Sequence, residues 1–572
     1  MSARQAMPSW PGRGTGAVRP LFAAALLAGL AWPTQAANLD AGALLQNNQP
    51  LPQAQPPARL MPLVDVPEPV AAPAVAGMAF RVNRIKVTGN RQIATETLDD
   101  LLRDVGGQDL TLAQLDQVCA RITDHYRSLG YLLTRAFVPA QTLADGVVEV
   151  RVAEVRYGQI TVDNHGPASN ALLRATLSDL QPGLAIAAGP LEHALLLVSD
   201  LPGLLAESTL RPGAEPGTSD LTVTTSAAAR TAGLVAIDDY GSQATGRGRI
   251  SAALSLFDPL QLGSSDMLGI SALHSGPALN HWRLAYEAVL SGNGTRVGAA
   301  TSGLRYALDG AVASAQASGS AKVNSLWLRQ PMLRQREGKL AGQMGYEDLQ
   351  CADVTADTAQ RGRQVRNWTF SLNGDVNDGL FGGVASTAFS VGLSRGQVGF
   401  QDLSSQGLDE VTGKVQGGFT KLTLSVTRLQ SLARDQSLRL TLSTQSTNQN
   451  LDPSQKLSVG GPASLRAYDS GVASGDAGYL LGVEYRHDWH VASAGQLQAL
   501  VFAEHASLTV NKKTWTADVN TVQLTDVGVG LNWDSGQQWH ARAFIAKAIG
   551  RPLVGAGEHP SLRFRTELGK EF

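Results

Sequence analysis

The stretch Leu562-Arg-Phe-Arg-Thr-Glu-Leu-Gly-Lys-Glu-Phe572 decides the fold, because its residues alternate between two chemical types. Side chains on a β-strand point alternately to opposite sides, so this strand has one mainly apolar face and one charged face. The apolar face carries Leu562, Phe564, Leu568 and Phe572, and the other face carries arginines and glutamates. A lipid exterior and a wet lumen suit this pattern, with Lys570 close enough to the end to snorkel. We therefore predict the last strand of an outer-membrane β-barrel.

The region from about Ala232 to Phe572 repeats this texture, with alternating segments separated by glycine, asparagine, aspartate and serine. A soluble β-sandwich also alternates, but it needs turn signals every 8 to 12 residues or so, whereas many connections here are long and charged. Roughly 340 residues, at about 10 per tilted strand plus connections, allow on the order of 16 strands. We expect a mainly β fold, with a 16-stranded transmembrane barrel in residues 229–572.

Composition and the first residues indicate where the protein acts. The chain has 572 residues with 47 basic and 49 acidic ones, so charge offers no case for nucleic acid as a partner. Arginines precede the apolar run Leu21 to Ala31, and small residues follow up to Ala36, which predicts a secretory signal over residues 1–36. Cys119 falls in a helical pattern and Cys351 in a distant polar segment, so we do not expect a structural disulfide.

Residues 37–78 predict a short helix followed by a proline-rich linker. Asp40 is a suitable cap for about two turns of helix that carry Leu44 and Leu45 and end near Asn47. The prolines that follow favour extended conformations without a packed core. From these residues alone the segment is either a disordered tether or a functional plug.

Residues 79–156 and 157–228 each predict the order strand, helix, helix, strand, strand. The first unit has a strand over Arg81–Thr88, helices around Leu98 and Leu115, and two further strands, Leu132–Val138 and Val147–Val155, with a turn at Asp145-Gly146. The second unit repeats this order at once. Two copies of one α+β unit therefore precede the barrel.

These units resemble the paired POTRA domains of two-partner secretion transporters, the TpsB family. The resemblance rests on positions that include Arg135, Pro139, Gln141 and Gly146 in the first unit and Pro202 and Gly203 in the second. The terminal Phe572 likewise resembles the aromatic carboxyl-terminal signal by which bacterial barrels are recognised for insertion.

The long segment from Ser443 to Gly478 contains Gly460-Gly461 and Leu465-Arg-Ala-Tyr468, which resembles the conserved loop motif of that family. In the family the loop arginine meets an aspartate in a Phe-x-Asp-x-Gly motif on a lumen strand. Phe502-Ala-Glu-His-Ala506 corresponds to that motif here, so the resemblance implies that Arg466 pairs with Glu504. A guanidinium suits this role because it can hold a carboxylate through two parallel hydrogen bonds. Ala467 stands where the family has glycine, so a left-handed backbone there would be strained or reshaped.

The resemblance implies an outer-membrane translocation pore that exports a large partner exoprotein, such as an adhesin, a cytolysin or a contact-dependent toxin, without nucleotide hydrolysis. The units would lie in the periplasm of a Gram-negative bacterium and capture the partner's amino-terminal secretion domain. The helix with Asp40, Leu44 and Leu45 would plug the resting lumen. Expected further partners are outer-membrane lipid and the barrel assembly machinery, and we expect a monomer.

Two other classes of protein are weighed against export. A barrel-assembly factor of the same superfamily would share the loop, but it usually carries more POTRA copies and lacks the plug helix. A barrel enzyme would need a catalytic cluster, and the sequence offers neither a nucleophile elbow nor a metalloprotease helix. His487 and His490 lie three apart and so face opposite sides of a strand, which argues against a metal site. We expect no catalytic residue, no metal and no cofactor.

Overall fold

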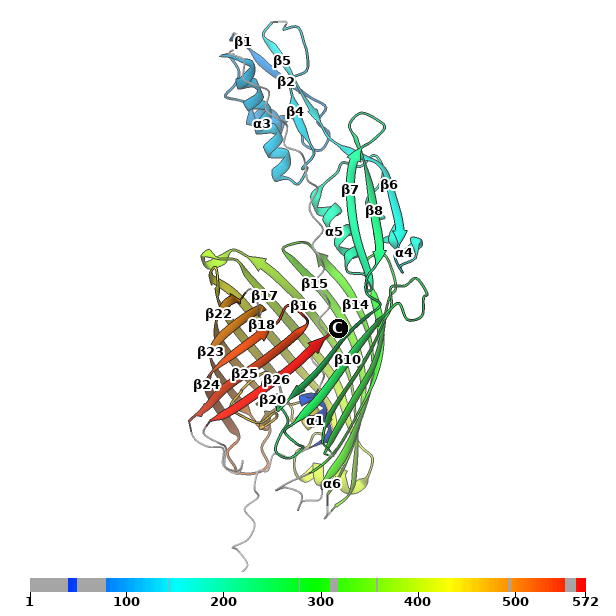
Figure 1. The fold of residues 1–572 in the computed structure, drawn as a ribbon, viewed down its shortest axis with the longest axis vertical. Helices are drawn as coiled ribbons and strands as arrows, with labels where there is room; N and C mark the ends of the chain where they lie inside the picture. The colour runs from blue at the N-terminus through cyan, green and yellow to red at the C-terminus, as the bar shows by residue number, and fades with distance from the viewer. Residues whose placement is uncertain are drawn as a thin grey trace, which may run out of the picture.

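The computed structural model describes residues 40–48, 79–143, 145–276, 278–308, 317–355, 358–491, 495–550 and 562–572. Two α+β units are stacked on one end of a barrel, and a short helix lies inside the barrel (Figure 1). The predicted signal, residues 1–36, and almost all of the predicted linker lie outside the described residues. No helix in the described ranges has the length and apolar content needed to cross a membrane.

The first unit packs two helices against a small mixed sheet. Its elements are β1 (Phe80–Val82), β2 (Arg84–Thr88), α2 (Thr95–Leu101), β3 (Gln108–Leu110), α3 (Leu112–Ser128), β4 (Arg135–Phe137) and β5 (Val147–Ala153). The sheet has the order β2-β5-β4 with β2 and β5 parallel, and β1 pairs with β3. Thr111 and Gln114 form a capping box at the start of α3, and Ile122 and Tyr126 on this helix are fully buried in the core.

Two strand predictions for this unit were wrong in extent. The predicted strand Arg81–Thr88 is broken at Asn83, whose N–H donates to the carbonyl of Gly146 over 2.7 Å, so that β1 and β2 pair with different strands. The predicted strand Leu132–Val138 contains only the three residues of β4.

The second unit repeats the architecture of the first. Its elements are β6 (Arg156–His165), α4 (Asn170–Thr176), α5 (Ala188–Ser199), β7 (Leu204–Pro212) and β8 (Thr218–Ala227), and its sheet has the order β6-β8-β7. Strands β6 and β8 are parallel, as β2 and β5 are in the first unit. The predicted repetition of strand, helix, helix, strand, strand is present.

The described residues form a closed antiparallel barrel of 16 strands, as predicted. The strands are β9 (Thr231–Asp238), β10 (Arg249–Phe257), β11 (Met267–Ser275), β12 (Leu279–Val289), β13 (Arg296–Ala307), β14 (Ser318–Arg334), β15 (Gly338–Thr355), β16 (Thr358–Asp378), β17 (Ala385–Phe400), β18 (Gly417–Ala433), β19 (Gln436–Thr447), β22 (Ala477–Val491), β23 (Gly495–Thr509), β24 (Thr521–Asp534), β25 (Trp539–Ile549) and β26 (Arg563–Glu571). Connections at the end that carries the α+β units are mostly short, whereas the opposite end carries the longer ones, including α6 (Leu403–Val411).

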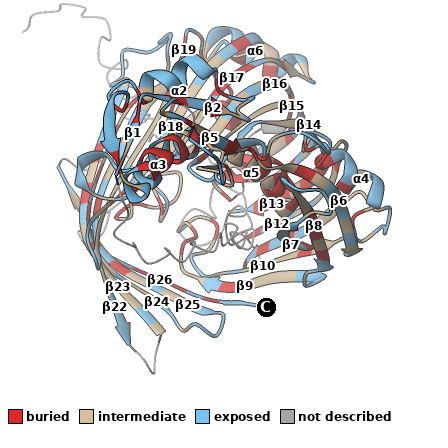
Figure 2. Cartoon of the chain, turned by 90° about the horizontal axis from the view of Figure 1, so that it is seen from above, coloured by how far each residue is buried: buried red, intermediate tan, exposed pale blue. Residues whose placement is uncertain are grey.

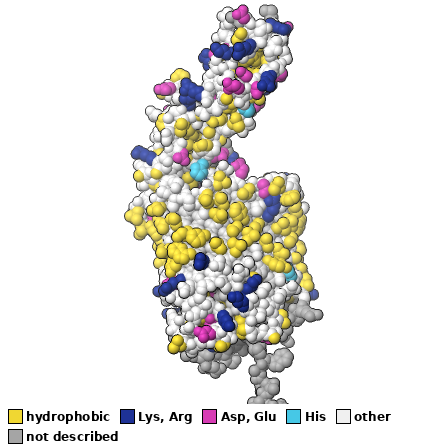
Figure 3. All heavy atoms as spheres, turned by 180° about the vertical axis from the view of Figure 1, so that it is seen from behind, with side chains coloured by type: hydrophobic (Ala, Val, Ile, Leu, Met, Phe, Trp, Pro, Cys, Tyr) yellow, Lys and Arg dark blue, Asp and Glu magenta, His cyan; other side chains and the backbone are white. Residues whose placement is uncertain are grey.

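The two faces of the barrel wall differ as the last strand predicts. On β26, Phe564 and Leu568 are exposed to the outside, whereas Arg563, Arg565 and Glu567 are buried on the lumen side. On the face of the barrel seen in Figure 3, hydrophobic side chains form a broad band across the outside. An apolar band around a polar interior is the pattern of an outer-membrane barrel.

The barrel closes between its first and last strands at Phe572. The N–H of Phe572 donates to the carbonyl of Gly233 over 3.0 Å, and the N–H of Gly233 donates back over 2.8 Å. A Cβ on Gly233 would lie 2.2 Å from the ring atom Cζ of Phe572, so glycine at this position leaves room for the ring. The terminal aromatic residue thus completes the seam between β26 and β9.

The second α+β unit is fixed to the rim of the barrel. Seen along the barrel, the strands form a ring and this unit lies over the side of β12 and β13 (Figure 2). The carboxylate of Asp200 accepts hydrogen bonds from Arg334 Nε and Nη2 over 2.7 and 2.9 Å. Gly203, next to Pro202, has φ of 73°, and a Cβ there would lie 2.8 Å from Cβ of Phe257. Both contacts join the loop after α5 to the barrel strands.

The two cysteines are free and lie in different parts of the molecule. Cys119 is buried in α3 and Cys351 is buried in β15. Burial raises the pKa of the Cys119 thiol to about 11, so this thiol stays protonated at neutral pH.

Candidate functional site

The connection between β19 and β22 folds back into the lumen. Its base contains η3 (Pro453–Gln455) and a two-stranded ribbon of β20 (Leu457–Val459) and β21 (Ala473–Gly475). The connection is shorter than the predicted Ser443–Gly478, because β19 continues to Thr447 and β22 begins at Ala477. The polar residues that suggested a loop there, such as Ser443 and Gln445, are lumen-facing positions of a strand.

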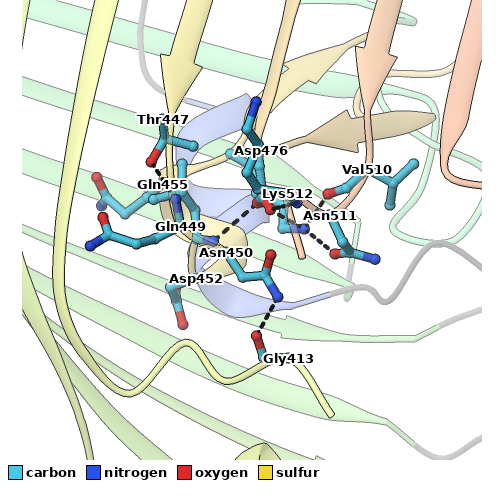
Figure 4. A network of polar contacts seen from close by, with 12 residues as sticks. Gly413, Thr447, Gln449, Asn450, Asp452, Gln455, Asp476, Val510, Asn511 and Lys512 are labelled. Carbon is cyan, nitrogen blue, oxygen red and sulfur yellow. Dashed lines mark hydrogen bonds and ion pairs between the residues drawn. The ribbon is translucent and has the colours of Figure 1, made fainter. Parts of the chain in front are cut away.

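Asp476 holds the base of this loop in place (Figure 4). Its fully buried carboxylate accepts hydrogen bonds from the N–H groups of Leu451 and Lys512 over 3.0 and 2.7 Å, and it lies 3.1 Å from Lys456 Nζ. The Asn450 amide nearby donates to the carbonyl of Gly413 over 2.6 Å. The loop is therefore attached to the neighbouring loops at the end of the barrel opposite the α+β units.

Gly460 and Gly461 shape the turn from which the tip of the loop extends. Both have positive φ, of 106° and 94°. A Cβ on Gly460 would lie 2.2 Å from the carbonyl oxygen of Asp469, so the turn requires glycine there. The N–H of Gly461 donates to the carbonyls of Leu465 and Tyr468 over 3.1 and 3.2 Å, which closes the tip into a compact hairpin-like turn.

Arg466, at this tip, lies between two carboxylates from neighbouring strands. Its Nε is 3.2 Å from Glu504 Oε1 on β23, and its Nη2 is 2.5 Å from Glu484 Oε2 on β22. Its guanidinium carbon lies 3.9 Å from the centre of the Phe502 ring, within the range of a cation–π contact. The structure thus places Arg466 with both residues of the predicted lumen motif, and it adds Glu484 as a partner that the motif did not indicate.

The carboxylates also bind the backbone of the tip. Glu504 Oε2 accepts the N–H of Arg466 over 2.9 Å, and Asp526 Oδ2 on β24 accepts the N–H of Ala467 over 2.8 Å. Ala467 is not among the described residues with positive φ, so alanine in place of the family's glycine introduces no strain of the kind we considered. Ala506, which stands at the second family glycine, is buried in the strand pairing of β23 with 1% exposure.

Leu465 and Tyr468 anchor the tip through apolar contacts. Leu465 is fully buried in a cluster that includes Phe502 and Phe544, and the Tyr468 hydroxyl donates to the carbonyl of Thr525 over 3.2 Å. A further ionic contact binds the tip to the last strand, where Asp469 pairs with Arg563 and Arg565. The loop therefore covers the wall formed by β22 to β26.

Helix α1 (Ala41–Asn47) occupies the lumen near the opposite wall. Asp40 caps it by accepting the N–H groups of Gly42 and Ala43 over 2.8 and 3.1 Å. Leu44 and Leu45 are buried against lumen residues of β12 to β18. A Cβ on Gly42 would lie 2.7 Å from Cβ of Ser454 in η3, so the helix also packs closely against the loop.

Arg363 on β16 binds the helix through a cluster of three carboxylates. Its nitrogens lie 2.5 Å from Asp40, 2.8 Å from Asp353 on β15 and 2.6 Å from Asp452 in the loop. Sequence reasoning missed this cluster, because its members come from four segments with no common motif. The sequence signal that could have indicated this cluster was an arginine at a lumen position of one strand, Arg363, with an aspartate, Asp353, on the preceding strand.

The predicted motif residues of the first unit shape its sheet edge. The amide of Gln141 pairs with the backbone of Glu149 in both directions over 2.8 Å, and it also donates to the carbonyl of Pro139 over 3.3 Å. Gly146 has φ of 69°, and a Cβ there would lie 2.7 Å from Asn83. Arg135 begins β4. These residues order the β4–β5 connection.

Two family profiles match the chain. Residues 80–154 match the profile described as a POTRA domain of ShlB type. Residues 217–531, more than half of the chain, match the profile of the haemolysin secretion/activation protein ShlB/FhaC/HecB.

Individual proteins are similar over different shares of the chain. The heme/hemopexin transporter protein HuxB of Haemophilus influenzae is 25% identical over 91% of this chain and 93% of its own length. The outer membrane transporter CdiB of Escherichia coli O6:K15:H31 is 29% identical over 36% of this chain and 35% of its own length.

Two solved structures share the fold. CdiB from Escherichia coli matches with a TM-score of 0.68 at 20% identity, over 90% of this chain and 94% of the other. A BamA from Haemophilus ducreyi that lacks POTRA domains 1–3 matches with a TM-score of 0.51 at 14% identity, over 86% of this chain and 100% of the other.

Proposed function

This chain belongs to the family of haemolysin secretion/activation proteins ShlB/FhaC/HecB, and we propose that it exports one large partner protein through its lumen. In this proposal α1 is released from the lumen, whereas the connection between β19 and β22, which we call the Arg466 loop, stays in place. The protein is an outer-membrane transporter with a periplasmic POTRA domain that exports a partner exoprotein. The observation that carries the mechanism is the different attachment of the two lumen segments. Asp40 joins α1 to the wall through Arg363, whereas the Arg466 loop is joined to β19 and β22 at both ends.

The export route begins at the α+β units. We assign residues 79–156 and 157–228 to two POTRA domains, 229–572 to the barrel and 37–78 to the plug helix with its linker. The parallel and antiparallel strand order is the same in both units, which supports the second assignment. The sheets end in edge strands that can accept an added strand from the partner's amino-terminal secretion domain.

In this proposal the partner protein, and not this chain, determines the direction of export. The sequence carries no Walker-type phosphate loop, so nucleotide hydrolysis is not its energy source. Folding of the partner outside the cell would keep it from returning. We assign the protein no enzymatic activity, cofactor or metal, and we propose that it works as a monomer inserted by the barrel assembly machinery.

A barrel-assembly factor is the alternative within the same superfamily. The match to the BamA fragment concerns the fold alone. A helix bound inside the lumen favours export, because a pore that conducts a polypeptide needs a closed resting state.

The function is tested by secretion of a reporter. The neighbouring genes are read for a very large secreted protein, and its amino-terminal secretion domain is fused to a reporter and expressed with the transporter. We expect the reporter in the medium only when the transporter is present. Retention in the periplasm in both strains, with the barrel correctly inserted, would contradict export.

A further inference from the structure

Four adjacent strands, β16 to β19, present small uncharged polar side chains to the lumen. We call six of them the hydroxyl wall: Thr369, Ser390, Ser394, Thr423, Ser425 and Ser443. The registers of the strands place them side by side, since Ser390 is opposite Ser425 and Ser425 is opposite Ser443.

The lumen side of these residues follows from their neighbours. Phe370, Leu393 and Leu422 alternate with them and are 51%, 47% and 49% exposed on the lipid side. Because side chains alternate along a strand, the hydroxyls face inward. Ser425 and Ser443 lie 3.0 Å apart, and Ser425 is exposed, so lumen water reaches this wall.

The adjoining wall, formed by β22 to β26, has the contrary character, and it begins at β22, which pairs with β19. It carries buried charges such as Glu484, Glu504 and Arg565, and the Arg466 loop covers it. The loop thus occupies the charged wall, whereas on the hydroxyl wall Ser394 is buried and Ser425 is exposed to the lumen.

We propose that the exported polypeptide passes in extended form along the hydroxyl wall; this inference rests on the proposed export function. A hydroxyl both donates and accepts hydrogen bonds, so it can replace water at any backbone N–H or C=O of the moving chain. Such an exchange is nearly balanced, and the hydroxyls themselves hold neither acidic nor basic segments by ionic attraction. The lumen-facing cation on these strands opposite Ser394, Lys421, donates to the carbonyl of Gln455 over 3.1 Å. The wall therefore suits an unfolded substrate of any charge.

The position of α1 supports this path. On the same strands, toward the end away from the α+β units, Val365 and Val398 are paired and belong to the apolar cluster that contains Leu44. The helix thus lies at the far end of the hydroxyl wall. Its withdrawal would open the exit of this path.

Peptide blockades of the pore in planar bilayers test the path. The pore is the full chain without residues 40–47, and the probes are unfolded glycine- and serine-rich peptides with or without lysine pairs. We expect Thr423→Asp with Ser443→Asp to lengthen blockades by the lysine peptide about tenfold, because two carboxylates attract it as it passes. Blockades of this variant by the neutral peptide should keep their wild-type length. The uncharged variant Thr423→Asn with Ser443→Asn, whose new side chains have the shape of aspartate, should show wild-type blockades by the lysine peptide as well.

The control is Ser251→Asp on β10, across the barrel. Ser251 faces the lumen because its neighbour Ile250 is 48% exposed on the outside. We expect a change below about twofold there. An equal lengthening by Ser251→Asp would overturn the hydroxyl-wall path while leaving export intact. If no peptide blocks the pore that lacks residues 40–47, the proposed export function fails, and the path fails with it.

Discussion

Arg363 and Arg466 lie in one lumen and bind carboxylates in similar ways, but they fasten different kinds of segment. Arg466 belongs to the loop, and its partners Glu484 and Glu504 belong to the wall. Arg363 belongs to the wall, and one of its three partners, Asp40, belongs to the helix. The side chains of both arginines are nearly buried, with 8% exposure for Arg363 and 12% for Arg466.

The two arginines differ in which buried charges lose their partners when the helix or the loop leaves the wall. If α1 withdraws, Arg363 keeps Asp353 and Asp452, so no buried charge loses all its partners. If the tip of the loop withdraws, Glu484 keeps Arg486, but the buried Glu504 loses the cation of Arg466. Leaving a buried charge without its partner costs about 3–5 kcal/mol. The helix is therefore the segment that can be released, and the loop is the one that stays.

The largest expected effect is that of Arg466→Ala. Losing about 3–5 kcal/mol of docking free energy should reduce the fraction of pores with a seated tip by about 100-fold or more. We predict that export of the partner into the medium is lost. Heat-modifiable migration on gels should show that the barrel still folds and inserts. Normal export by this variant would remove the loop from the mechanism.

Deleting residues 40–47 should open the pore without affecting the loop. The helix fills part of the lumen against Leu304 and Phe419, so its removal leaves a water-filled passage. We predict a several-fold rise in single-channel conductance in planar bilayers. Unchanged conductance would show that the helix does not close the pore.

A smaller effect is expected from Arg363→Met, which removes the cation and keeps an unbranched apolar stem. Asp40, Asp353 and Asp452 would then repel one another, which favours the state with the helix released. We predict a conductance that alternates between the wild-type level and that of the deletion variant. The matched control is Arg366→Met on the same strand, whose side chain is 59% exposed and should not change the trace.

Exchanging the charges tests the loop pair itself. Arg466→Glu and Glu504→Arg should each prevent export, and together they should restore about a tenth of it. The restoration is incomplete because the new carboxylate at position 466 would face Glu484. Secretion measured in all four strains gives the coupling, and no restoration at all would argue against a direct pair.

The smallest expected effect is that of Ala467→Gly, which restores the family residue. Ala467 is buried and has no positive φ, so glycine brings no relief of strain and costs about 0.5–1 kcal/mol of backbone entropy. Export should fall less than about fivefold. A clear gain in export would indicate that alanine distorts the tip.

Alternation predicted the barrel because lipid and water impose opposite chemistry on neighbouring residues, as Phe564 and Arg565 show. The same alternation concealed the ends of β19 and β22, since lumen-facing polar residues look like loop residues. The break at Asn83 was not predictable from local pattern, because it depends on a hydrogen bond to Gly146 in a distant turn.

The site was predictable where a motif carried it. Arg466 and Glu504 came from two motifs whose spacing resembles a family, and the structure brings them together. Asp526 escaped notice because it meets Ala467 only through the register of β23 with β24. Arg363 escaped for the same reason on a larger scale, since its partners are far apart in the chain.

The most direct test of independent release measures two distances by pulsed electron spin resonance, each in its own doubly labelled sample. Cys119 and Cys351 are replaced by alanine, and spin labels are placed at Asn47 and Arg366 for the helix or at Ala463 and Val501 for the loop. The transporter is studied in vesicles with and without the partner's secretion domain. We predict that this domain lengthens and broadens the helix distance while the loop distance stays constant. A loop distance that changes together with the helix distance would contradict separate fastening by Arg363 and Arg466.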